Sequence, residues 1–257
     1  MTYLVVVLVA FAASGLTFFS GFGLGTLLLP AFALFFPAEH AVSLTAVVHF
    51  LNGLFKLALV ARRADLGVVV RFGVPAIVAS FAGATVLVWL SGAEPLLTYQ
   101  VLGRQAQVTP VKLAVGLLLL VFGVAELLPQ SRAVSFGPRY LPVGGALSGF
   151  FGGVSGHQDA LRSAFLVRCG LTKEAFIGTG VVIACAVDAA RLFEYGRNMD
   201  FAPIRERWLL VAAAIACAAA GAVLAARALP RISMRAIRRF VTVMLFTIAV
   251  LLMAGLV

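Results

Sequence analysis

Residues 148–166 read SGFFGGVSGHQDALRSAFL, a glycine-rich stretch with polar and charged residues near its centre. It lies inside a longer apolar segment at 141–167. Because glycine weakens helices and permits sharp turns, this stretch predicts a helix that breaks or turns back on itself. Backbone of this kind is tolerated inside a membrane only where it is buried in protein or lines a cavity.

The composition places the chain in lipid. Of its 257 residues, 62% are hydrophobic and only 12% are charged, and the mean hydropathy is +1.08. A soluble domain carries about a quarter charged residues, and about 20 apolar residues span a bilayer as a helix. We therefore predict an all-α polytopic membrane protein. Its apolar segments are 3–35, 41–60, 70–90, 111–128, 141–167, 175–195, 208–228 and 238–257.

The eight segments form two similar groups of four. Segment 41–57, AVSLTAVVHFLNGLFKL, and segment 175–192, AFIGTGVVIACAVDAARL, share the pattern A-x-x-x-T-x-V-V without a gap. Each follows a glycine-rich stretch, SGLTFFSGFGLGTLLLP at 14–30 in the first case. Self-similarity of this kind indicates duplication. We predict an N-terminal transmembrane repeat at 1–128 and a C-terminal one at 129–257.

The positive charges predict how the segments cross the membrane. Residues 3–35 as one helix would be about 50 Å long, well beyond a bilayer core of about 30 Å. If the first segment of each half returns to its own side, loops 61–71, 129–140, 168–173 and 227–239 share twelve of the 20 Lys and Arg residues, against five opposite. Loops rich in Lys and Arg stay in the cytoplasm. Each half then crosses three times, so the two halves are inverted and each begins with a broken helix or helical hairpin.

Polar residues form a stripe in the second segment. Thr45, His49, Asn52 and Lys56 are separated by four, three and four residues, which places them on one helix face. In a membrane helix such a face points into the bundle. The stripe predicts groups that contact a substrate or carry a proton; the alternative is hydrogen bonding between helices, with Lys56 reaching the interface.

The densest polar cluster is His157-Gln158-Asp159 with Arg162, at the second break. Free backbone N–H groups and helix N-termini at a break attract anions, and the planar guanidinium of Arg162 suits an oxoanion. This cluster predicts a substrate or proton site. In the alternative, Asp159 and Arg162 only neutralise each other.

A third charged pair, Asp188 and Arg191, lies one turn apart in the sixth segment. Arg191 falls within one residue of the position that corresponds to Lys56, which suggests a site between the two halves; the alternative is an ion pair near the membrane edge. The intramembrane charges sum to +1, which favours an anion as ligand. Tyr195, near the end of this segment, is expected to anchor the interface.

No sequence feature points to an enzyme. Neither H-E-x-x-H nor G-x-S-x-G occurs, and the three histidines and three cysteines have no metal-ligand or disulfide spacing. The basic residues lie between apolar segments, where they contact lipid headgroups rather than nucleic acid. We expect no catalysis, cofactor, metal site or nucleic-acid partner.

The two glycine-rich stretches, each before an A-x-x-x-T-x-V-V helix, make the chain resemble the sulfite exporter TauE/SafE family of bacterial inner-membrane transporters over nearly its whole length. This resemblance implies export of sulfite or an organosulfonate such as sulfoacetate, coupled to the proton gradient. It also implies substrate contacts in both breaks. An anion channel and an accessory membrane subunit remain alternatives, and homodimerisation is left open.

Combining the residue patterns with this resemblance gives a set of site residues. Substrate contacts are expected at Ser20, Gly21, Gly23, Asn52, Lys56, His157, Gln158, Arg162 and Arg191. Proton carriers are expected among His49, His157, Asp159 and Asp188.

Overall fold

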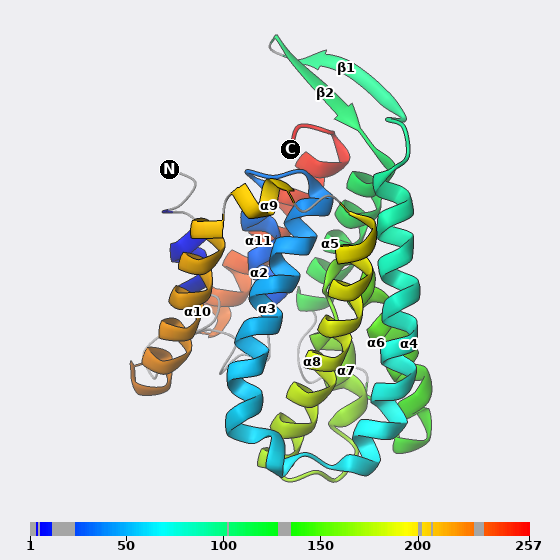
Figure 1. The fold of residues 1–257 in the computed structure, drawn as a ribbon, viewed down its shortest axis with the longest axis vertical. Helices are drawn as coiled ribbons and strands as arrows, with labels where there is room; N and C mark the ends of the chain where they lie inside the picture. The colour runs from blue at the N-terminus through cyan, green and yellow to red at the C-terminus, as the bar shows by residue number, and fades with distance from the viewer. Residues whose placement is uncertain are drawn as a thin grey trace.

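The computed structural model describes residues 4, 6–11, 24–101, 103–127, 135–199, 202–206, 208–228 and 234–257, and these are mostly helical (Figure 1). The elements are α2 (Leu24–Ala33), α3 (Ala38–Val60), η1 (Ala61–Arg63), α4 (Leu66–Ser91), β1 (Leu97–Val101), β2 (Arg104–Val108), α5 (Pro110–Leu127), η3 (Pro138–Tyr140), α6 (Leu141–Ser155), α7 (Asp159–Leu166), α8 (Lys173–Asn198), α9 (Ala202–Glu206), α10 (Trp208–Ala228) and α11 (Met234–Met253).

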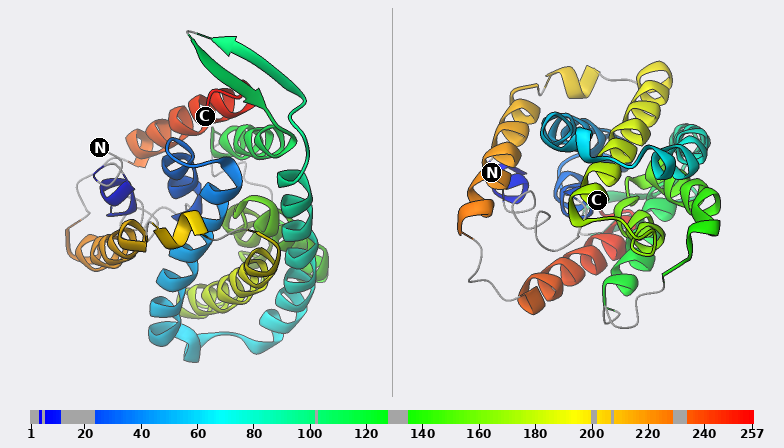
Figure 2. Two further views of the ribbon diagram at one scale, coloured as in Figure 1. Left: turned by 45° about the horizontal axis from the view of Figure 1, so that its top comes forward. Right: turned by 90° about the horizontal axis from the view of Figure 1, so that it is seen from below.

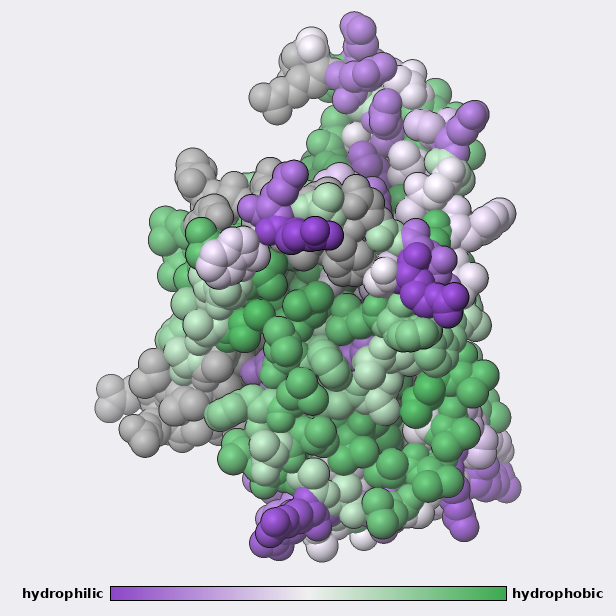
Figure 3. All heavy atoms as spheres, viewed as in Figure 1, coloured by the Kyte–Doolittle hydropathy of each residue, from purple (hydrophilic) through white to green (hydrophobic). Residues whose placement is uncertain are grey.

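Within the described residues, three helical spans are long and apolar enough to cross a membrane: Ala38–Arg63, Leu66–Ser91 and Lys173–Asn198, each of 26 residues. A helix of that length measures about 39 Å. Figure 3 shows a broad hydrophobic band around the middle of the molecule, with hydrophilic residues gathered at its two ends. The chain is therefore a multi-pass membrane protein, as its composition predicted.

The second glycine-rich stretch forms a helical hairpin. Helix α6 ends at Ser155, Gly156 adopts a φ of 82°, and α7 begins at Asp159. At the open end, the Phe136 N–H donates to the Ala164 carbonyl oxygen (3.1 Å). The chain thus returns to the level at which it entered, which confirms the hairpin predicted for 141–167. The first glycine-rich break lies mainly in 12–23, outside the described residues.

Three of the loops that the positive charges grouped on one side lie at the same end of the described structure; part of the fourth, 227–239, lies outside the described residues. The turn at η1, the segment around η3 and the connection from α7 to α8 lie together at the lower end of Figure 1. The Asp65 N–H donates to Thr179 Oγ1 (2.8 Å), and the Asp65 side chain caps α4 by accepting from the Val68 N–H (2.9 Å). These bonds tie the α3–α4 turn to the beginning of α8.

The opposite end carries an antiparallel β-hairpin in the connection between the third and fourth apolar segments, which the pattern of apolar segments did not predict. Strands β1 and β2 pair from Leu97 with Val108 to Val101 with Arg104, and the hairpin projects from the helical body (Figure 2). The Tyr99 hydroxyl donates to the Ala254 carbonyl oxygen (2.5 Å), which anchors the hairpin to the end of α11. The all-α prediction therefore holds for the apolar segments but not for this extramembrane connection.

Helices α4 and α6 pack in unusually close contact because glycines line their interface. A Cβ atom on Gly145, Gly149 or Gly153 would lie only 2.1, 2.0 and 2.3 Å from carbonyl oxygens of α4. Around this pair, α8 packs on both α3 and α4, while α5 packs on α11. The hairpin tip is thereby held beside α3 and α8, in the middle of the bundle.

Candidate functional site

Three groups of polar residues that are far apart in sequence meet at the hairpin tip. His49 on α3 stands at their centre, buried in the bundle. Its Nδ1 lies 2.5 Å from Asp188 Oδ2 on α8, and its Nε2 lies 3.6 Å from Asp159 Oδ2 on α7. One imidazole therefore connects both carboxylates. Because each ring nitrogen faces a carboxylate oxygen, the imidazolium form can hydrogen-bond Asp188 and form an ion pair with Asp159 at the same time.

Arg191 is paired with Asp188, and both side chains are fully buried. Its Nε and Nη2 lie 3.0 and 2.7 Å from Asp188 Oδ1, and its Nη1 donates to the Gly152 carbonyl oxygen on α6 (3.3 Å). Arg191 and Asp188 thus form the ion pair within α8 that the structural alternative described, and Arg191 also joins α8 to the hairpin.

Gly156 makes this approach of Arg191 possible. Its φ of 82° is a conformation that side-chain-bearing residues rarely adopt. A Cβ atom at this position would also lie 2.8 Å from Nη1 of Arg191. The break and the buried guanidinium therefore depend on the same glycine.

Asp159 and Arg162 form an ion pair within α7, with Nη2 of Arg162 2.5 Å from Oδ1 of Asp159. They neutralise each other, as the structural alternative predicted. However, Nη1 of Arg162 is buried and has no hydrogen-bond partner among the described residues. Gly180 on α8 leaves room beside this side chain, because a Cβ there would lie 3.4 Å from Nε of Arg162. Arg162 thus retains one donor group that is unused within the described protein.

Gln158 and His157 complete the hairpin tip. Gln158 Nε2 donates to Asp188 Oδ1 (3.0 Å), and the main-chain carbonyl oxygen of Gln158 accepts from Ser148 Oγ (2.9 Å). His157 Nδ1 lies 3.1 Å from Ser155 Oγ, and its ring stacks on Phe122 of α5 with centroids 4.8 Å apart. Both side chains are buried.

The other predicted residues are distributed around this cluster. Asn52 is buried on α3, and Lys56 lies one turn further along that helix, half-buried. Thr45 Oγ1 donates to the Ala41 carbonyl oxygen (2.8 Å), so this hydroxyl is satisfied within its own helix. Three residues of the first break lie outside the described residues: Ser20, Gly21 and Gly23.

The beginning of α2 nevertheless connects the first break to the second. A Cβ on Gly25, in the first turn of α2, would lie 3.3 Å from the Gly156 carbonyl oxygen. The residues directly after the first break therefore reach the tip of the second.

Sequence analysis missed three contributors to this cluster: Phe122, Ser148 and Tyr195. Phe122 and Ser148 lie in apolar segments with nothing to distinguish them from packing residues. Tyr195, expected as an interface anchor, is instead fully buried and donates its hydroxyl hydrogen to the Gly153 carbonyl oxygen. Tyr195 lies four residues after Arg191 and therefore on the same face of α8, and this spacing could have indicated that its side chain points into the cluster.

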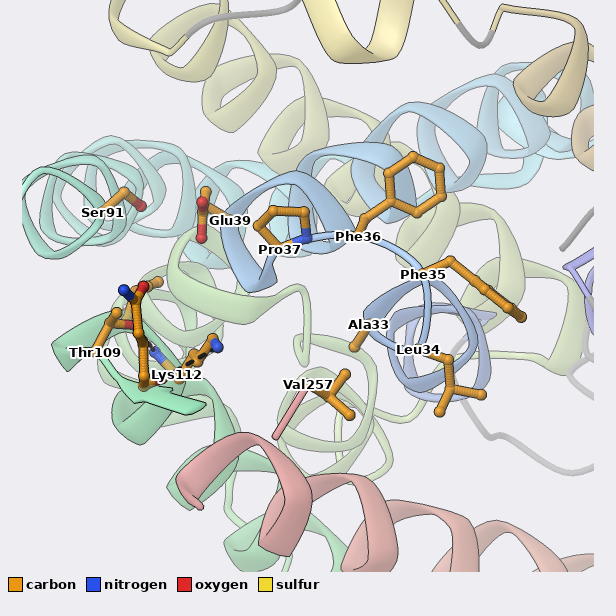
Figure 4. A pocket seen from close by; sticks show the side chains of 12 residues that line it. Ala33, Leu34, Phe35, Phe36, Pro37, Glu39, Ser91, Thr109, Lys112 and Val257 are labelled. Atoms are coloured by element: carbon orange, nitrogen blue, oxygen red, sulfur yellow. Dashed lines mark hydrogen bonds between the residues drawn. The ribbon is translucent and has the colours of Figure 1, made fainter. Parts of the chain in front are cut away.

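A second polar feature lies at the end of the molecule that carries the β-hairpin. A pocket of about 440 Å³ opens there between the α2–α3 connection, the base of the hairpin and the beginning of α5. Glu39 and Lys112 contribute charged groups to its wall (Figure 4). Lys112 Nζ donates to the Gln107 carbonyl oxygen (3.1 Å), which fixes the amine at the hairpin base.

Comparison with known proteins identifies the family. The family model described as sulfite exporter TauE/SafE matches residues 6–252, nearly the whole chain. Comparisons with curated proteins and with solved structures gave no match. The match confirms the resemblance carried by the two glycine-rich stretches and the helices that follow them. This chain belongs to the sulfite exporter TauE/SafE family of membrane transporters.

Proposed function

We propose that this protein is a secondary transporter that exports a small sulfur-containing anion across the bacterial inner membrane. Sulfite and organosulfonates such as sulfoacetate are the candidate substrates, and the proton gradient is the proposed energy source. The observation that carries the proposal is the buried charged cluster at the tip of a broken helix, between α3 and α8. Transporters place substrate sites at such discontinuous helices near the bilayer midplane.

The charges of the cluster favour an anion. Lys56, Arg162 and Arg191 outnumber Asp159 and Asp188 by one positive charge, before any proton on His49 is counted. Arg162 has a donor left over, and backbone amides near the break add positive potential. We place the substrate beside Arg162 and Gln158, and Ser20, Gly21 and Gly23 remain predicted contacts from the first break. Asn52, Lys56, His157 and Arg191 complete the proposed site.

His49 is the proposed coupling residue, with Asp159 and Asp188 as its partners. In its doubly protonated form it hydrogen-bonds Asp188 and forms an ion pair with Asp159. A neutral ring has one N–H group, so loss of a proton releases either the hairpin carboxylate or the α8 carboxylate. Protonation then changes how tightly the hairpin is held against α3 and α8, which provides a route from proton transfer to alternating access. His157 remains a second candidate proton carrier.

Helix packing supports two inverted halves divided at 128. The second helices of the proposed halves, α3 and α8, pack on each other, as do the fourth, α5 and α11. Each third helix packs on the second helix of the other half: α4 packs on α8, and α10 packs on α3. Gly83 of α4 approaches the Phe150 backbone, and Gly221 of α10 approaches the Phe11 backbone. A pseudo-twofold axis produces this pattern, in which corresponding helices of the two halves contact each other and contacts between different helices occur in reciprocal pairs.

Transport of sulfite in proteoliposomes tests the proposal, with Arg162→Gln as the variant. Removing the guanidinium removes the anion-binding donor, and we expect uptake to fall at least about tenfold, since charge-assisted hydrogen bonds contribute about 1.5–3 kcal/mol. Arg71→Gln is the matched control, because Arg71 is exposed on α4 and its variant should transport normally.

The same preparation distinguishes a carrier from a channel. A carrier is accelerated by substrate on the trans side, whereas a channel is not. Sulfite uptake without trans-stimulation would show that the protein is an anion channel and not a carrier. Absence of uptake with every sulfur anion, in a folded protein, would favour an accessory subunit.

A further inference from the structure

His157 presents a hydrogen-bond acceptor to the site. Ser155 Oγ lies 3.1 Å from both the Phe151 carbonyl oxygen and Nδ1 of His157. We assign its single hydrogen to the carbonyl oxygen, which can only accept, so that the lone pairs of Oγ remain for Nδ1. Nδ1 is therefore the nitrogen that carries the hydrogen, and Nε2 of the neutral ring holds a lone pair. Nε2 is buried and has no hydrogen-bond partner among the described residues.

The surroundings of His157 favour the neutral ring. One face lies flat on Phe122, with an interplanar angle of 11°. Within the described part of the chain, no carboxylate oxygen comes within ion-pair distance of the ring. The Arg191 guanidinium lies against the adjacent Gly156. Protonation of His157 would place a second positive charge beside the Arg191 guanidinium, which is unfavourable.

Gln158 presents a second acceptor whose orientation is fixed. A carboxylate only accepts hydrogen bonds, so the atom of Gln158 that faces Asp188 must be its amide nitrogen, Nε2. Oε1 consequently points elsewhere. It is buried and unpartnered within the described residues, and the side chain is 0% exposed. Leaving such an acceptor unsatisfied in a low-dielectric site is unfavourable.

Asn52 extends this acceptor side to α3, because its Oδ1 is also buried and unpartnered in the described structure. The single unused donor of Arg162 lies on α7, in the same cluster. The site therefore offers an unused charged donor group at Arg162 for anionic oxygens, and acceptors that lack a hydrogen at His157, Gln158 and Asn52. An oxoanion without hydrogen atoms can accept from the Arg162 donor but cannot donate to these acceptors.

We propose that the site is built for a singly charged sulfur oxoanion that carries its own hydrogen-bond donor, such as hydrogensulfite or a hydroxy- or aminoalkanesulfonate. This rests on the proposed anion-transport function and narrows its substrate class. The sulfur oxygens face Nη1 of Arg162, and an O–H or N–H group of the ligand donates to His157 Nε2 and Gln158 Oε1.

Two ligands that differ in one hydroxyl group test the inference. 2-Hydroxyethanesulfonate and ethanesulfonate carry the same charge, and only the first has a donor hydrogen. Isothermal titration of the detergent-purified wild-type protein should show at least about tenfold tighter binding of the hydroxylated ligand, because sites built to hydrogen-bond a ligand hydroxyl discriminate strongly against its absence. His157→Phe preserves an aromatic ring against Phe122 but removes the acceptor, and should reduce this preference. Arg162→Gln should weaken both ligands equally.

The outcomes separate this inference from the proposed function. Equal binding of both ligands by the wild-type protein would overturn the donor requirement and leave the anion site standing. A preference that persists unchanged in a folded His157→Phe protein would remove His157 from the acceptor set. If neither ligand binds, nor sulfite, the anion site itself fails, and the inference fails with it.

Discussion

His49 illustrates how a single side chain connects separate parts of this fold. Its ring touches a carboxylate from α8 and faces another from α7, so its protonation state affects both contacts at once. The carboxylates are not equivalent. Asp188 also accepts from Gln158 and Arg191, whereas Asp159 pairs with Arg162. Loss of a proton should therefore release the weaker Asp159 contact first and loosen the hairpin.

Substituting His49 by Gln tests this role. Glutamine keeps donor capacity toward one carboxylate but cannot gain or lose a proton near neutral pH. We expect sulfite transport to slow at least about tenfold and to lose its dependence on pH. Transport into proteoliposomes at a series of pH values measures both effects.

His40→Gln is the control, because His40 lies near the beginning of α3, beside Glu39 rather than in the cluster. Its variant should keep the wild-type pH profile. A His49→Gln protein that transported with an unchanged profile would show that the coupling proton resides elsewhere, with His157 as the next residue to examine.

Among the helices, the α4–α6 contact holds the hairpin in place. Gly149→Ala would bring a Cβ within 2.0 Å of the Ala76 carbonyl oxygen, so the two helices would have to separate. Overpacking of this kind costs about 1–3 kcal/mol. We expect a lower melting temperature of the purified protein and, since the hairpin tip moves with α6, reduced transport.

Gly196→Ala provides the matched control. Gly196 is also helical, in α8, but no atom lies within 4 Å of its added Cβ. Alanine is favoured over glycine in helices by about 0.5–1 kcal/mol, so this variant should be as stable as the wild type or slightly more stable. Equal melting temperatures for the two variants would show that the α4–α6 interface adapts easily.

The sequence predicted which helices carry polar groups, but not which groups pair. Helical spacing placed His49 and Asn52 on one face, and the glycines predicted the break at Gly156. The contact between His49 and Asp188 joins residues 139 positions apart, and it depends on how closely α3, α8 and α6 approach. Apolar membrane segments carry little periodic pattern to predict such packing. Phe122 was missed for this reason, because the sequence does not distinguish an aromatic residue that stacks on a buried histidine from one that packs against apolar side chains.

The molecule as a whole is polarised between a basic end and the β-hairpin end. The positive-inside rule places the basic end in the cytoplasm. Cysteine labelling tests this in a protein whose native Cys169, Cys185 and Cys217 have been replaced by alanine. Gln105→Cys reports on the β-hairpin, while Gly137→Cys and Lys173→Cys lie on either side of the α6–α7 hairpin.

An impermeant maleimide applied to intact cells should label Gln105→Cys, and it should reach the other two positions only after permeabilisation. The two positions around the hairpin must behave alike, because 141–166 enters and leaves at the same level: the Phe136 N–H bonds to Ala164. Opposite reactivity at 137 and 173 would mean that this segment crosses the membrane, and the inverted arrangement would be lost. Labelling of both, with protection of 105, would keep the fold but reverse its orientation. The basic end would then face outward, and the pocket at the β-hairpin end would open to the cytoplasm.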